Sequence, residues 1–122
     1  MKVEIKLDYK AIRKIEQAAK AAAVDTMEQL YTDLVNSKTM PFDRGNMQNN
    51  QTFVDSTESG AVLITGSPQV RRLYYHPEYN FQQKEGANGS RGAYWLEPYI
   101  TGSKKEFVQA EFTEIFKRRA GL

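Results

Sequence analysis

His76 is the only imidazole in the sequence, so any histidine-based catalysis or metal binding would depend on it. Glu78 stands two residues later, and with Asp43 the pair could form the acid–base centre of a hydrolase. Asp43, Glu78 and Glu97 could alternatively gather as a carboxylate site for a cation. Their spacing favours neither site over ordinary loop charges, and a histidine beside Pro77 also suits packing or an interface. We therefore expect no catalytic residue, no cofactor and no metal site.

Basic residues offer a second kind of chemistry, the binding of nucleic acid. Arg71 and Arg72 precede Tyr74 and Tyr75, which mixes cations with stacking faces as single-strand binders do. The full basic set would be Arg71, Arg72, Lys104, Lys105, Lys117, Arg118 and Arg119. The sequence pI of about 8.8 is below the range expected of a dedicated binder. A basic-patch nucleic-acid-binding accessory protein is thus the alternative function.

The glycine-rich stretch 86–92 does not match a phosphate-binding loop. It lacks the Gly-Lys-Ser/Thr ending and does not lead from a strand straight into a helix. We expect residues 78–92 to form a mobile loop.

Two segments, residues 40–48 and 72–81, combine turn formers with aromatic side chains. Residues 72–81 concentrate tyrosine and phenylalanine at spacings that fit no single helical face. Such a concentration is typical of an interface hot spot, although a core closed by a loop remains a second interpretation.

A long helix must position these segments. Apolar or small residues recur every three or four positions from Ile12 to Leu34, which predicts one buried face on a helix from about Asp8 to Asn36. At 1.5 Å per residue this helix is roughly 40 Å long. A domain of 122 residues does not easily cover that length, so we expect part of the helix to project or to meet another subunit.

Strands and a second helix complete the expected fold. Residues 3–7 alternate apolar and charged side chains and predict a short edge strand, and residues 52–54 and 61–65 predict a β-hairpin. Residues 69–76 predict one or two helical turns stopped by Pro77.

Ser103 and Glu106 form a capping box for a last helix that Gly121 closes. This order predicts one α+β domain over residues 1–122, with a long N-terminal helix and a C-terminal helix packed on a small antiparallel sheet.

Composition narrows the class of protein. The sequence has no cysteine, which excludes disulfide scaffolds, thiolate zinc sites and cysteine nucleophiles. The first twenty residues lack the apolar run of a signal peptide, and no window approaches the roughly 20 apolar residues of a membrane span. We therefore expect a soluble protein of the cytoplasm that has no membrane partner.

The net charge is only +2, but the charged residues are distributed unevenly along the sequence. Residues 1–20 hold six bases and three acids, residues 104–119 hold five bases and three acids, and the stretch between them holds six bases and nine acids. Basic ends around an acidic middle indicate contact with a polyanion, subunits that meet head to tail, or simply solvated helix faces.

The two unusual segments carry a family resemblance. The chain resembles the minor capsid proteins of tailed phages and prophages of Gram-positive bacteria, which are related to tail-completion and head–tail joining proteins. Their Pro-x-Asp-x-Gly segment is matched by Pro41, Asp43 and Gly45, and their Arg-Leu-Tyr-Tyr-His-Pro-Glu-Tyr-Asn-Phe segment is matched throughout residues 72–81. A Trp-x-Glu-Pro element corresponds to residues 95–98, and the resemblance spans roughly residues 20–120.

The resemblance implies a virion structural protein without enzymatic activity, located at the neck and, during assembly, in the host cytoplasm. It implies that copies of the chain form a ring in the virion that joins the DNA-filled head to the tail, whereas the isolated chain can be a monomer. The implied partners are neighbouring connector and tail proteins, with the packaged DNA as a non-specific contact. The candidate interface residues are Pro41, Asp43, Gly45, Arg71, Arg72, Tyr74, Tyr75, His76, Pro77, Tyr79, Phe81 and Trp95.

Overall fold

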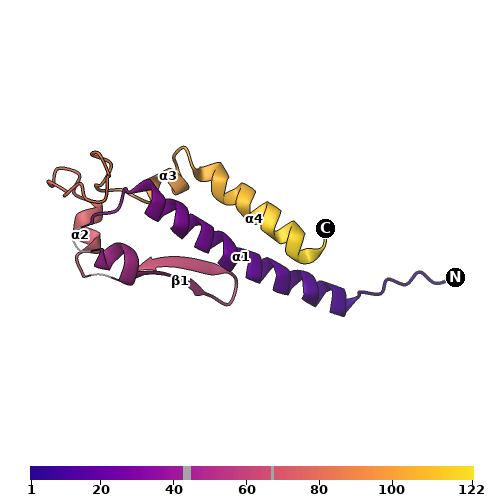
Figure 1. Ribbon diagram of the computed structural model, residues 1–122. Coiled ribbons are helices and arrows are strands. Elements are labelled where there is room, and N and C mark those ends of the chain that lie inside the picture. The colour runs from indigo at the N-terminus through magenta and orange to yellow at the C-terminus, as the bar shows by residue number, and fades with distance from the viewer. Residues whose placement is uncertain (43–44, 67) are drawn as a thin grey trace.

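One long helix, α1 (Tyr9–Ser37), organises the chain in a computed structural model that describes residues 1–42, 45–66 and 68–122. A shorter helix, α4 (Lys105–Ala120), lies alongside it, and a β-hairpin lies along another side (Figure 1). The expected α+β class is confirmed, with a long N-terminal helix, a C-terminal helix and a small antiparallel sheet. None of the helices in the described ranges is long and apolar enough to cross a lipid bilayer.

The predicted bounds of α1 are confirmed at both ends. Asp8 accepts a hydrogen bond from the Ala11 N–H at 3.1 Å, which satisfies one of the free donors of the first turn. Lys38 takes a left-handed conformation with φ 55° and ends the helix. The buried stripe consists of Ala18, Ala22, Thr26, Leu30 and Leu34.

The N-terminal part of α1 has no such cover. Ile12 and Ile15 continue the stripe but are exposed, and α1 extends past α4 and the hairpin toward its N-terminus (Figure 1). The expected projection of the helix is therefore present in the structure, and residues 1–8, here called the N-terminal arm, extend the molecule further (Figure 1).

The predicted edge strand at residues 3–7 is wrong, because these residues form no regular structure and all of them are exposed. A strand needs a neighbour for its backbone hydrogen bonds, and the alternating pattern alone does not supply one.

The predicted hairpin is confirmed as β1 (Thr52–Ser56) and β2 (Ala61–Thr65), paired antiparallel. The inner face, which includes the Val54–Leu63 pair, turns toward α1, and Leu63 packs against the core. The opposite face, here called the outer face, consists of Phe53, Asp55, Val62 and Ile64.

Two short helices connect the hairpin to α4. They are α2 (Val70–Tyr74), as predicted ahead of Pro77, and α3 (Glu97–Ile100). Residues 78–92 form no helix or strand, and residues 46–50 form a π-helical turn, η1 (Asn46–Asn50).

The predicted capping box of the last helix is wrong. Its N-cap is Lys104, with no side-chain capping bond, and Ser103 lies outside the helix. The cause is the tight connection from α3, where the Gly102 N–H donates to the Glu97 carbonyl at 3.0 Å and the Lys104 N–H donates to the Pro98 carbonyl at 2.8 Å. Gly102 lies so close to Pro98 that a Cβ added to Gly102 would lie 2.8 Å from the Cα of Pro98. Gly121 closes α4 with φ 74°, as predicted.

The core lies at the C-terminal end of α1. Its buried side chains are Leu30, Leu34, Met40, Met47, Trp95 and Tyr99. They come from α1, the segment that follows it, η1 and the chain around α3, so one cluster joins segments far apart in the sequence. Burying apolar side chains of this size stabilises a fold by about 1.5–3 kcal/mol each.

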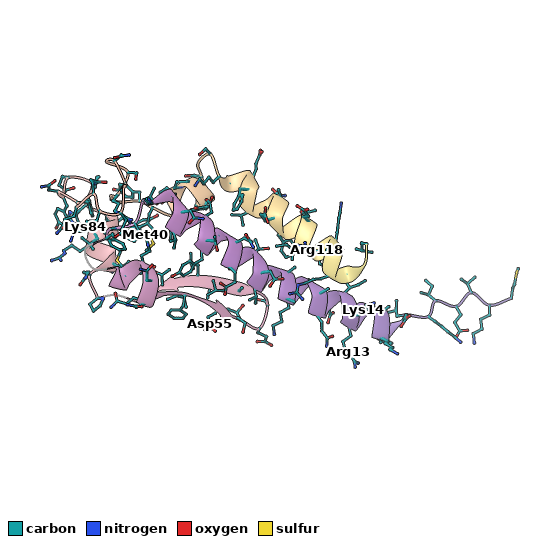
Figure 2. The ribbon with its side chains drawn as sticks, in the orientation of Figure 1. Arg13, Lys14, Met40, Asp55, Lys84 and Arg118 are labelled. Atoms are coloured by element: carbon teal, nitrogen blue, oxygen red, sulfur yellow. The ribbon has the colours of Figure 1, made fainter. Side chains whose placement is uncertain are left out.

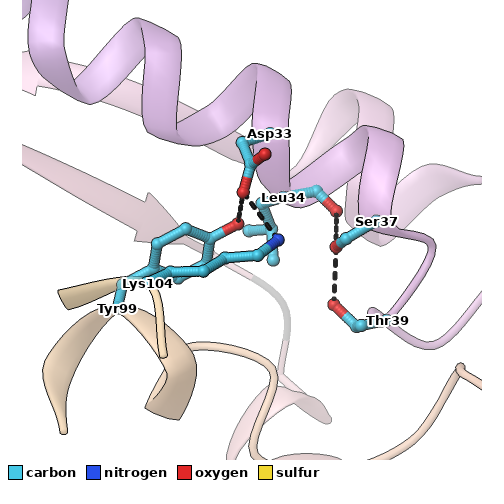
Figure 3. A network of polar contacts seen from close by, with 6 residues as sticks. All are labelled: Asp33, Leu34, Ser37, Thr39, Tyr99 and Lys104. Atoms are coloured by element: carbon cyan, nitrogen blue, oxygen red, sulfur yellow. Dashed lines mark hydrogen bonds and ion pairs between the residues drawn. The ribbon is translucent and has the colours of Figure 1, made fainter. Parts of the chain in front are cut away.

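A polar clamp fixes α3 and α4 to α1 beside this core (Figure 3). Tyr99 Oη donates to Asp33 Oδ2 at 2.6 Å, and Lys104 Nζ donates to the same oxygen at 2.8 Å. Burial acts to raise the pKa of Asp33, but the hydrogen bonds from Lys104 and Tyr99 outweigh it and lower that pKa. Burial and the bond to Asp33 raise the pKa of Tyr99. The clamp thus favours a charged Asp33 and a protonated Tyr99.

Tyr99→Phe should lower the free energy of unfolding by about 1.5–3 kcal/mol, the range for hydrogen bonds to charged groups. The ring keeps its packing and only the bond to Asp33 is lost. Urea unfolding followed by circular dichroism measures the change. Tyr9→Phe is the matched control, because Tyr9 is exposed and its hydroxyl should be dispensable; equal effects of the two substitutions would contradict the clamp.

Candidate functional site

The two unusual sequence segments come together at the end of the molecule opposite the N-terminal arm (Figure 1). Arg91 Nη1 donates to the Met40 carbonyl at 2.8 Å, which attaches the glycine-rich loop to the chain after α1. The Tyr94 N–H donates to the Tyr74 carbonyl at 3.1 Å, which attaches the following residues to α2. Within the described ranges, residues 40–42, 45–48, 70–81 and 91–99 therefore form one structural unit.

The candidate interface residues separate by burial within this unit. Two are buried and form part of its interior: Gly45 and Trp95. Four are half-buried: Pro41, Tyr74, His76 and Phe81. Five are exposed: Arg71, Arg72, Tyr75, Pro77 and Tyr79. Asp43 lies outside the described residues. One set of residues therefore closes the core, as the second interpretation expects, and another set faces solvent, where an interface stays a prediction.

Tyr74 joins the interior to the surface. Its ring meets Trp95 edge to face, with centroids 4.7 Å apart. On the solvent side it meets Tyr75 and Tyr94 in the same manner, at 5.1 and 5.6 Å. Its hydroxyl donates to Glu97 Oε1 at 3.2 Å. Burial and the negative charge of Glu97 raise the pKa of Tyr74 to about 12, so the hydroxyl stays protonated at neutral pH.

His76 forms a second, exposed group with its neighbours. Its Nδ1 lies 2.6 Å from Glu78 Oε1, and its ring stacks on Tyr79 with centroids 4.7 Å apart. The hydrogen bond with His76 lowers the pKa of Glu78. Tyr79 in turn lies near Phe81, at 6.4 Å between ring centroids. These contacts hold the aromatic side chains of the loop in fixed positions, which reduces the entropy cost of binding a partner.

Of the residues considered for a hydrolase site, the structure brings His76 and Glu78 together. The two described acids considered for a cation site, Glu78 and Glu97, have different partners. Glu78 pairs with His76, whereas Glu97 accepts hydrogen bonds from Tyr74 and Thr101. Within residues 1–42, 45–66 and 68–122, no group of three or more His, Asp or Glu side chains is placed to hold a metal ion.

Arg91 is the residue of this unit that sequence patterns missed. It is 3% exposed and donates from Nε to the Lys84 carbonyl at 2.9 Å and from Nη1 to Gln48 Oε1 at 3.1 Å. Its guanidinium also lies over the Phe42 ring, 4.6 Å from the centroid. Burial lowers the pKa of Arg91, although Glu85 opposes that shift.

Arg91 thereby anchors the loop that composition predicts to be mobile. Gln83 strengthens the anchor, since its amide nitrogen donates to the Arg91 carbonyl at 2.8 Å and its Oε1 accepts from the Arg91 N–H at 2.9 Å. The only sequence signal is a single arginine within a glycine-rich stretch, and it does not distinguish a buried anchor from a surface charge.

The basic residues of the alternative function differ in their contacts and in their positions. Lys104 contacts Asp33, and Arg119 contacts Asp25 at 2.6 Å, so acids of the middle region pair with bases of α4 and its N-cap within the same chain. Arg71 and Arg72 lie on α2, away from the basic end of α4. The geometry does not gather the seven bases into one patch.

The arrangement therefore presents aromatic side chains and two arginines to solvent from an anchored frame, and these residue types are enriched at protein interfaces in general. Comparisons of the chain with protein-family models, with curated proteins and with solved structures find no match.

Arg91→Met should lower the free energy of unfolding by about 2 kcal/mol or more, because it leaves the buried Met40 carbonyl and Gln48 amide without their donor. It should also increase amide hydrogen exchange throughout residues 81–92. Arg71→Met serves as the control, since Arg71 is exposed on α2. Unchanged exchange in the loop of the Arg91 variant would show that Arg91 is no anchor.

Proposed function

We propose that the protein is a non-enzymatic structural component of a tailed bacteriophage virion, a minor capsid or tail-completion protein at the head–tail connector. In this role, copies of the chain form a ring that joins the DNA-filled head to the tail. The resemblance of residues 72–81 to a segment of phage and prophage minor capsid proteins is the sequence basis of the proposal.

The observation that carries the proposal is the surface built by that motif. Tyr75 and Tyr79 are exposed, yet neighbouring rings hold both of them in place. Large aromatic side chains with fixed geometry and arginines beside them are the residue types that dominate binding energy at protein interfaces. We assign this surface to contact with a neighbouring connector or tail protein.

The shape of the molecule supports assembly into a ring. The aromatic surface and the N-terminal arm lie at opposite ends of α1, so a contact of the arm with another copy leaves the aromatic surface accessible to a connector or tail protein (Figure 1). A ring requires a heterologous interface, in which two different patches of each subunit meet, and closure of that contact gives a cyclic assembly. Neighbouring copies, adjacent neck proteins and non-specific contact with the packaged DNA are the partners that this role requires, in the virion and in the host cytoplasm during assembly.

Deletion of the gene from the phage or prophage that encodes it tests this role. We expect electron microscopy of the lysate to show full heads and complete tails that are not joined, and complementation with the intact gene to restore infectious particles. Normal infectious particles from the deletion would contradict the proposal.

Complementation with surface variants tests the assigned residues in the same assay. Tyr75→Ser combined with Tyr79→Ser should fail to restore joining, whereas Gln109→Ser combined with Thr113→Ser on α4 should restore it. Both double variants change only exposed residues, and circular dichroism of the purified proteins checks that they fold.

A further inference from the structure

The N-terminal arm and the outer face of the hairpin are two apolar surfaces without cover in the described parts of the chain. On the arm, Val3 is 93%, Ile5 84% and Leu7 58% exposed. On the outer face, Phe53 is 48% and Val62 39% exposed. Apolar side chains that gather in rows, rather than singly, indicate surfaces that another molecule buries.

The arm cannot lay its whole apolar row on the outer face of its own hairpin. A Cβ on Gly60, in the hairpin turn, would lie 3.9 Å from Ala23 on α1, which is about 21 Å along the helix from Tyr9 at 1.5 Å per residue. Phe53 and Ile64 lie farther away still, three residues along the strands from the turn and on the face directed away from α1. Even when fully extended, the arm carries Ile5 only about 13 Å from Tyr9. An arm whose Ile5 and Leu7 lie on the outer face must therefore come from a second copy.

The spacing of the two surfaces is matched. In an extended chain, side chains two residues apart point the same way and are separated by about 6.6 Å. Val3, Ile5 and Leu7 have this spacing on the arm, and Val62 and Ile64 have it on β2. The two rows can therefore pack against each other over several contacts.

Charge also favours this pairing. Residues 1–17 carry five bases and three acids, whereas residues 52–66 carry two acids and no base. Figure 2 shows Arg13 and Lys14 on the overhanging end of α1, and Asp55 on the side of the hairpin away from α1. A basic arm and helix end thus meet an acidic hairpin when one copy approaches another.

We propose that the N-terminal arm of one copy of this chain binds the outer face of the hairpin of a second copy, with the row Val3, Ile5 and Leu7 packed on Phe53, Val62 and Ile64. The contact joins two different surfaces, so each subunit offers one arm and one hairpin and the interaction can propagate around a ring. The inference deepens the self-association included in the proposed function, and it names the surfaces that meet.

Engineered cysteines test the contact directly, because the native sequence contains none. Full-length Ile5→Cys and Phe53→Cys proteins, one carrying a tag, are mixed and oxidised, and the products are separated by mass without reductant. We expect the mixed dimer to predominate and to form several-fold faster than in a mixture of Ile5→Cys with Glu114→Cys, an exposed position on α4. A predominant dimer of two Ile5→Cys chains, or equal rates in the two mixtures, would overturn the proposal.

Sedimentation equilibrium of the unaltered and substituted chains gives the second measurement. Ile5→Ser combined with Leu7→Ser should weaken self-association about tenfold or more, because it removes apolar surface that the contact buries. Glu4→Ser combined with Lys6→Ser alters the other face of the arm, keeps the net charge and should leave association within about twofold. A chain that stays monomeric at millimolar concentration, or equal effects of the two double variants, would overturn the proposal. A negative result in these two experiments would contradict the contact between arm and hairpin but not the proposed virion role. Normal virions from the gene deletion would contradict the virion role but not this contact.

Discussion

The structure depends on the burial of one stripe of α1, from Ala18 to Leu34, between α4 and the hairpin. Ala22 is fully buried, and its small side chain lets a second element approach the helix closely. The stripe continues to Ile15 and Ile12, which no element in the described ranges covers. The C-terminal part of α1 is covered by other elements and forms the stable end of the molecule. The N-terminal part of α1 and the N-terminal arm are uncovered and form its open end.

At the stable end, buried polar groups fix connecting segments that apolar packing alone would not hold in one position. The Asp33 clamp fixes the connection into α4, and Arg91 fixes the loop of residues 81–92 against the chain that follows α1. Tyr74 connects the core to the exposed aromatic side chains, because its ring contacts Trp95 on one side and the exposed tyrosines on the other. The aromatic surface is consequently part of a rigid frame although it is built largely from loop residues, and that rigidity is what a docking surface needs.

Periodicity in the sequence predicts the elements whose burial is local and repetitive. The stripe of α1, its Asp8 cap, the hairpin and the Gly121 stop follow from spacing and turn chemistry, and all are present. The prediction fails where the outcome depends on distant partners. The strand at residues 3–7 has no neighbour in the described chain, and the close contact of Gly102 with Pro98 displaces the predicted cap at Ser103. Arg91 meets Met40 and Gln48 across 51 and 43 residues, and no local pattern records such contacts.

The central claim is that the open end of one copy is completed by the hairpin of another. Amide hydrogen exchange measured by mass spectrometry, on dilute and concentrated samples of the full chain, tests it most directly. The account predicts that protection rises together in residues 1–17 and 53–64 as concentration increases, while protection of the core segment around Leu34 stays constant. Exchange in residues 1–17 and 53–64 that is independent of concentration would contradict it.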